Sequence, residues 1–176
     1  MQINQLGSNK GHTFLGIDPG SVYTGYAVLH CQQNGNIAYI DSGRISCGRA
    51  DFSQRLCILY AELKKVIQTH SPDFCAIEEL FVHKNPMSAL KLGHARGVAL
   101  LLCAQLTPNP VVSIPARQIK QALTGFGGAG KEQIQYMVRA ILRLEFTPST
   151  DEADALAIAW VLCEQQRRVR QLKGVT

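Results

Sequence analysis

Three β-rich segments lie close together near the start of the chain, at residues 14–18, 24–31 and 35–47. A Pro-Gly-Ser turn separates the first two segments, and the second connection is short as well. A parallel pair of strands would need a crossover of about a dozen residues or more, so connections this short join antiparallel neighbours. The sequence therefore predicts that the fold begins with a three-stranded antiparallel meander.

After residue 47 the hydrophobic pattern changes to the helical period. Strands are then predicted at 73–80 and 109–115, and helices at 50–70, 85–106, from 116 to the glycine-rich stretch 125–130, 131–146 and 150–170. Because these later strands alternate with helices, they should run parallel to their neighbours. The expected fold class is α/β, with a mixed five-stranded sheet (the meander plus parallel strands) flanked by helices.

The composition is that of a globular protein, with 46% hydrophobic and 18% charged residues. One domain is expected over residues 12–170, preceded by a polar extension (1–11) expected to be disordered and followed by a tail (171–176). The six cysteines form no C-x-x-C pair, which argues against a zinc site and favours buried free thiols in a reducing cytoplasm. The most apolar stretch, 97–106, is shorter than the ~20 residues that span a bilayer, so no membrane contact is expected.

Acidic residues end two of the predicted strands. Asp18 directly precedes Pro19 and Gly20, where it is either a turn residue or a metal ligand. Glu78 ends a later apolar strand, and the carboxyl ends of strands in open α/β sheets form ligand sites. The neighbouring Glu79 should point to the opposite face, because side chains alternate along a strand.

Two more acids, Asp151 and Asp154, begin the last predicted helix and share one of its faces. Ser149 or Thr150 can cap this helix, and Glu152 can complete a capping box with Ser149. Acids in a first turn also meet the helix dipole favourably, which explains Asp151 better than Asp154. Asp154 borders an apolar face, and no Lys or Arg follows it in the next helical turns.

If these four carboxylates converge without a local cation, they repel one another, and a hard divalent cation would relieve this. Two such ions ~3.5–4 Å apart can assist phosphoryl displacement. Removing four acids from the total of thirteen leaves nine against eighteen Lys and Arg residues. The rest of the surface is then basic, as a protein that binds a phosphate backbone requires.

Four segments together resemble a RuvC-type Holliday-junction resolvase of the ribonuclease-H-like fold. They read GIDPGSVYTGYAV, AIEELFVHKNPMSALKLGHARGVAL, PARQIKQALTGFGGAGKEQIQYMV and DEADALAIA, within residues 13–163. The resemblance implies a homodimeric endonuclease of the bacterial cytoplasm that nicks two opposed strands of a four-way DNA junction. It implies two Mg²⁺ ions per subunit, with Mn²⁺ able to substitute, and a branch-migration complex of the RuvA and RuvB type as partner in recombination and DNA repair.

The resemblance also assigns roles to particular residues. The aromatic that stacks on unpaired bases at the crossover falls on Phe81. Lysines that contact DNA near the scissile bond fall on Lys120 and Lys131, and Lys131 would steady charge on the phosphate. Lys84 and Arg117 are candidate phosphate contacts, with ordinary surface charges as the equal alternative. The catalytic and metal-binding acids fall on the four already found: Asp18, Glu78, Asp151 and Asp154.

The chain departs from the family pattern at Ala27, where Gly is frequent, and at Glu79, where Gln is common. In the helix expected at 85–106, Ala89, Gly93 and Gly97 recur at four-residue steps and leave a smooth face. That face is either a tight helix crossing within the domain or a dimer interface, which the resemblance favours.

Three other functions remain as alternatives. GIDPGSVYTG resembles the first phosphate loop of actin-like or sugar-kinase ATPases, but the sequence has no second such loop. A non-catalytic binder of structured DNA or RNA would gain nothing from four acids facing phosphates. A ribonuclease-H-like nuclease acting on RNA is excluded only by the resemblance.

Overall fold

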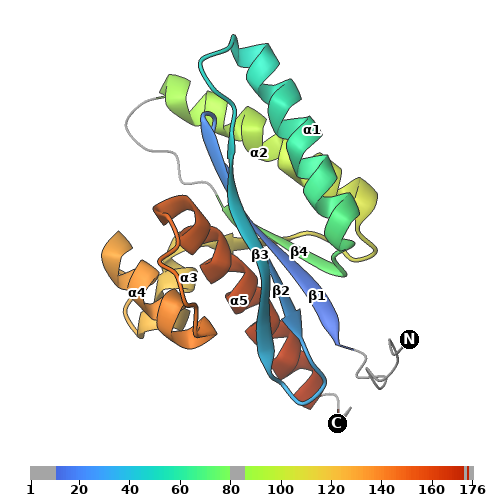
Figure 1. Cartoon of the computed structure of the whole chain (residues 1–176), viewed down its shortest axis with the longest axis vertical. Helices are drawn as coiled ribbons and strands as arrows, with labels where there is room; N and C mark the ends of the chain where they lie inside the picture. The colour runs from blue at the N-terminus through green and yellow to red at the C-terminus, as the bar shows by residue number, and fades with distance from the viewer. Residues whose placement is uncertain (1–10, 80–85, 173, 175–176) are drawn as a thin grey trace, which may run out of the picture.

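The computed structural model describes residues 11–79, 86–172 and 174 (Figure 1). Five strands form one sheet in the order β3-β2-β1-β4-β5. The strands are β1 (His12–Asp18), β2 (Tyr23–Cys31), β3 (Ile37–Ser46), β4 (Phe74–Glu79) and β5 (Val112–Pro115). The helices are α1 (Phe52–His70), α2 (Pro86–Leu106), α3 (Ala116–Thr124), α4 (Lys131–Leu142) and α5 (Thr150–Leu172). The predicted order of strands and helices is confirmed.

The pairing of the strands also agrees with the prediction. β1 with β2 and β2 with β3 are antiparallel, which is the expected meander. β1 with β4 and β4 with β5 are parallel. The chain crosses over through α2 between β4 and β5, and it reaches β4 from the meander through α1. The carboxyl ends of β1 and β4 therefore meet at one edge of the sheet.

Helices cover both faces of the sheet (Figure 1). α5 packs on one face with α3 and α4 beside it, and α1 and α2 cover the other. A hydrophobic core lies on each side of the sheet, and consecutive strand residues point into opposite cores. Phe14 is buried on the α5 side and Leu15 on the α1 side. Gly16 lies so close to α5 that a Cβ there would be 2.3 Å from the carbonyl oxygen of Ala155. Glycine in β1 thus lets α5 approach the sheet backbone closely.

Some predicted boundaries were wrong. α4 ends at Leu142 instead of 146, because Arg143 takes a left-handed conformation with a φ of 53°. α5 continues to Leu172, two residues into the predicted tail. All six cysteines are free, but Cys57 is exposed rather than buried. Residues 1–10 lie outside the described residues, so the expected disorder of the extension stays a prediction.

α2 begins one residue after the predicted start and ends at the predicted residue. By length and composition alone its 21 residues could cross a membrane, but one such helix is weak evidence for a membrane span. It packs against α1 and β4 through one face, whose buried residues are Ala95, Ala99, Leu102 and Cys103. Its other face is exposed.

Candidate active site

Asp18 and Glu78 lie side by side at the edge where β1 and β4 end. The parallel register pairs Ile17 with Ile77, which brings the following residue of each strand together. The Glu78 carboxyl is close enough to Asp18 to hydrogen-bond with it when Asp18 is protonated. Burial, followed by the charge and hydrogen bond of Glu78 and the charges of Asp154 and Asp151, raises the pKa of Asp18 to about 8. Asp18 is therefore no ordinary turn residue, since a solvated turn aspartate would ionise near 4.

Asp154 belongs to the same cluster. Its pKa is raised to about 6, chiefly by burial; the charge of Lys131 lowers it, those of Glu78 and Asp151 raise it, and that of Lys120 lowers it. The following turns of its own helix offer Asp154 no cation before Arg167. Its cations come from α3 and α4, which pack beside α5, and not from its own helix.

Asp151 has a cationic neighbour that the sequence did not reveal. Nη1 of Arg44, on β3, lies 3.7 Å from Oδ2 of Asp151. α5 can come this close because Gly25 has no side chain: a Cβ there would be 2.1 Å from the carbonyl oxygen of Asp151. The Arg44 guanidinium also lies 4.3 Å from the centre of the Tyr23 ring. No local sequence signal connects Arg44 to Asp151.

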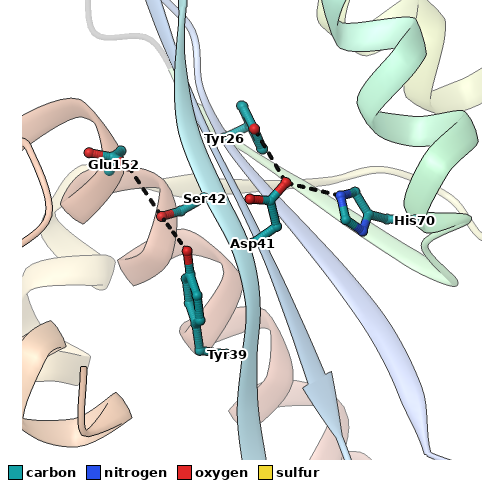
Figure 2. Close-up of polar contacts among 6 residues, drawn as sticks. All are labelled: Tyr26, Tyr39, Asp41, Ser42, His70 and Glu152. Carbon is teal, nitrogen blue, oxygen red and sulfur yellow. Dashed lines mark hydrogen bonds and ion pairs between the residues drawn. The ribbon is translucent and has the colours of Figure 1, made fainter. Parts of the chain in front are cut away.

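The first turn of α5 is fixed by a capping box, as predicted, and Ser149 is the cap. Its backbone N–H donates to Oε2 of Glu152 at 2.8 Å, and its hydroxyl accepts from the N–H of Glu152 at 3.4 Å. Ser42 of β3 donates to the other oxygen of Glu152 at 3.3 Å, and Ser42 is in turn 3.3 Å from the Tyr39 hydroxyl (Figure 2). This chain of hydrogen bonds ties the helix turn that carries the two aspartates to the sheet.

The neighbouring Asp41 points to the other face of the sheet (Figure 2). It accepts a hydrogen bond from the Tyr26 hydroxyl at 3.3 Å and lies 3.0 Å from Nε2 of His70 on α1. β3 is thereby held to both helical layers by consecutive residues.

A second arginine supports the strand ends from the opposite side. Nε of Arg96, on α2, donates to the backbone carbonyl of Glu78 at 3.0 Å, and Nη2 donates to Ser113 of β5 at 2.6 Å. Glu79 is exposed while Glu78 is half-buried, so the predicted alternation is confirmed. Like Arg44, Arg96 makes contacts far along the chain that no local pattern encodes.

Beside the acids lies a small cavity of about 30 Å³, room for about one or two waters. Its polar lining is Glu78, Asp154 and Lys120, which brings the predicted lysine to the acids. Arg117 is exposed on α3, with its side chain against Gly127. Phe81 and Lys84 lie outside the described residues.

The chemistry of the four acids suits Mg²⁺, which prefers carboxylate oxygens. Among residues 11–79, 86–172 and 174, no three His, Cys, Asp or Glu side chains are grouped closely enough to hold a metal ion as they stand. Asp18 has to lose its proton before it can be a metal ligand. The assignment of these four residues as metal ligands stays a prediction.

The sheet order, with acids at the ends of β1 and β4 and on the first turns of α5, defines the ribonuclease-H-like class of nucleases. Within it, the chain belongs to the family of the crossover junction endodeoxyribonuclease RuvC, which it matches over residues 14–162. The crossover junction endodeoxyribonuclease RuvC of Yersinia pestis (strain Pestoides F) is 46% identical over 158 residues, 90% of each chain.

Solved structures agree with this membership. Thermus thermophilus RuvC superposes with a TM-score of 0.78 at 31% identity, covering 89% of this chain and 96% of that one. The structure of T. thermophilus RuvC in complex with a Holliday junction substrate gives 0.81 at 30% identity over the same shares. The yeast mitochondrial Holliday junction resolvase Ydc2 (TM-score 0.65, 14% identity, 90% of this chain and 80% of that one) shares the fold.

Proposed function

We propose that this protein resolves Holliday junctions as a metal-dependent endonuclease, cutting two opposed strands of a four-way DNA junction. The observation that carries the proposal is the meeting of Asp18 and Glu78 at the ends of β1 and β4, beside the first turns of α5 that carry Asp151 and Asp154. Membership of the RuvC family supplies the reaction class. Neither an actin-like ATPase nor a non-catalytic binder is favoured by that membership.

The four carboxylates would hold Mg²⁺, two ions per subunit, with Mn²⁺ able to substitute. The metal, when bound, supplies an activated water and stabilises the leaving oxygen. The chain itself contributes the oxygen donors, and Arg96 and the Ser149 cap orient the elements that carry them. Lys131 steadies charge on the scissile phosphate, and Lys120 binds the DNA backbone beside it. The charges of both lysines already lower the pKa of Asp154, so both lie near the acids.

The proposal includes a homodimer formed through α2. A Cβ at Gly93 or Gly97 would meet nothing within 4 Å. These glycines are therefore not needed for close packing of α2 against another element among the described residues. Leu90 and Leu101 lie on the same face at helical spacing and are 58% and 53% exposed. A second copy placed on this stripe by a two-fold axis would put two active sites on one junction, which explains paired nicks.

The remaining parts of the proposal concern the setting. We place the protein in the bacterial cytoplasm, in recombination and repair of DNA, with a branch-migration complex of the RuvA and RuvB type as partner. Phe81 would stack on bases at the crossover. Lys84 and Arg117 would contact phosphates.

The active-site assignment is tested by paired substitutions of neighbouring acids. Glu78→Gln and Asp18→Asn should bind a labelled four-way junction and lose cleavage by more than about 100-fold, since even residues that only support a metal ligand change activity by about 10–100-fold. Glu79→Gln is the matched control, because Glu79 is exposed on the opposite face, and it should cut like the wild type. Full cleavage by Glu78→Gln or Asp18→Asn would overturn the assignment.

A further inference from the structure

Arg44 and Tyr23 form an exposed pair next to the catalytic acids. Both side chains are solvent-accessible, Tyr23 at 44% and Arg44 at 47%. The register pairs Arg44 with Gly25, and Tyr23 is two residues before Gly25, so both lie on the sheet face that carries α5. The guanidinium lies over the Tyr23 ring, 4.3 Å from its centre, with Asp151 3.7 Å away.

This pair lies on the opposite flank of the acids from the two lysines. Lys120 and Lys131, on α3 and α4, act on Asp154, whereas Arg44, on β3, contacts Asp151. β3 is one edge strand of the sheet and β5, which leads into α3, is the other, so Arg44 and Lys120 approach the acid cluster from different sides. A DNA strand that crosses the cluster would meet positive charge before and after the acids.

The ion pair to Asp151 does not account for an arginine at this position. Exposed ion pairs contribute little to stability, and 3.7 Å is a loose contact for one. A guanidinium has five N–H donors in a planar fork that matches phosphate oxygens. Stacking on Tyr23 holds this fork in place while it stays open to solvent, which lowers the entropy lost when it binds an anion.

We propose that Arg44, held on Tyr23, is a phosphate-binding residue for the DNA strand on the β3 side of the active site, and that it pairs with Asp151 only while metal and DNA are absent. When a divalent cation takes Asp151, like charges repel the guanidinium, which is then free for a phosphate. This inference rests on the proposed function. It adds a DNA contact that also links metal loading to DNA binding.

The test compares Arg44→Gln with Arg167→Gln. Arg167 is the matched control because its side chain is 43% exposed and also pairs with an acid, Glu164. Glu164 is thirteen residues further along α5 than Asp151 (164 − 151). Junction affinity is measured against salt concentration in Ca²⁺, with uncut DNA confirmed on a denaturing gel. Arg44→Gln should weaken binding by about 3- to 10-fold and lower the slope of log K against log salt by about 1. Arg167→Gln should match the wild type.

Three further measurements separate phosphate binding from a structural role. Without DNA, Mn²⁺ should bind Arg44→Gln about 2- to 5-fold more tightly, because a competing cation next to Asp151 is gone. Tyr23→Phe should retain junction affinity, whereas Tyr23→Leu should lose part of it. Arg44→Lys should restore the salt slope because it keeps the charge.

The inference is overturned if Arg44→Gln leaves both junction affinity and salt slope at wild-type values. It is equally overturned if Arg167→Gln weakens binding as much, which would mean a non-specific charge effect. Failure of the proposed function looks different: the wild type would then neither prefer a four-way junction over linear duplex nor cut it.

Discussion

At the scale of single residues, the chemistry of the site depends on carboxyl groups that are held close together before a metal arrives. The pKa of Asp18 is raised to about 8 and that of Asp154 to about 6, in both cases chiefly by burial. In the metal-free protein these groups keep protons at pH values where ordinary aspartates have lost them. Metal binding then has to release protons, so it should strengthen as the pH rises.

These shifts predict how stability depends on pH. The pKa of Asp18 is higher in the folded state than the 3.8 of an ordinary aspartate. At pH values between these two pKa values, the folded state binds more protons than the unfolded state. The contribution of Asp18 to stability is therefore present at low pH and is lost as the pH rises through about 8. In EDTA the unfolding temperature of the wild type should therefore fall relative to that of Asp18→Asn as the pH is raised from 5 to 8.5.

The measurement is thermal unfolding of both proteins by circular dichroism in EDTA. The unfolding temperature of Asp18→Asn should exceed that of the wild type by an amount that grows by at least about 5 °C from pH 5 to pH 8, because the unfolded wild type ionises Asp18 in this range while the folded wild type keeps its proton. Added Mg²⁺ should stabilise the wild type more at pH 8 than at pH 5. A constant difference between the two proteins across this pH range would contradict the raised pKa.

The convergence of the acids could be predicted from the sequence and the nearby Lys120 and Lys131 from the family resemblance, whereas Arg44 could not. Asp18 and Glu78 each end an apolar strand, and parallel strands bring such ends to one edge. Arg44 reaches Asp151 only because Gly25 lets α5 lie against the sheet, which is a contact between three distant segments. The role of Tyr23 as a support for Arg44 was hidden for the same reason.

At the scale of elements, the N-terminus of α5 is the part whose position matters most for the site. Either Ser149 or Thr150 could be its cap by sequence, and the hydrogen bonds place Ser149 there. The link from Ser42 to Glu152 adds an attachment to β3 that the capping pattern does not encode. The end of α4 was missed because Arg143, a residue that rarely takes a left-handed conformation, ends it.

The cap can be tested by two neighbouring substitutions. Ser149→Ala should lower the free energy of unfolding by about 1 kcal/mol, which is typical for the loss of an N-cap side chain. Thr150→Ala should change it by no more than about 0.5 kcal/mol, because Thr150 is exposed. Urea denaturation in EDTA gives both values. Equal losses for the two variants would contradict the assignment of Ser149 as the cap.

At the scale of the whole molecule, the proposed homodimer places a second copy of the chain on the exposed face of α2. Gly93→Leu should weaken self-association, because a large side chain would keep two helices apart where glycine allows close approach. The fold should survive, since a Cβ at Gly93 meets nothing within 4 Å. Sedimentation equilibrium should show the wild type as a dimer and Gly93→Leu with a dissociation constant raised by at least about 10-fold.

The control is Ala140→Leu, which enlarges an exposed small residue on α4, in the other helical layer. It should leave the dimer intact. A wild-type protein that is monomeric at micromolar concentration, or a Gly93→Leu variant that dimerises as well as the wild type, would contradict the interface on α2.

The most direct test of the central claim is the pattern of cuts on a synthetic four-way junction in Mg²⁺, with each strand labelled in turn. A Holliday-junction resolvase should place nicks symmetrically in two opposed strands, should leave a linear duplex of the same sequence uncut, and should stop when EDTA removes the metal. Single unpaired nicks, equal cutting of linear duplex, or cleavage that persists in EDTA would contradict it.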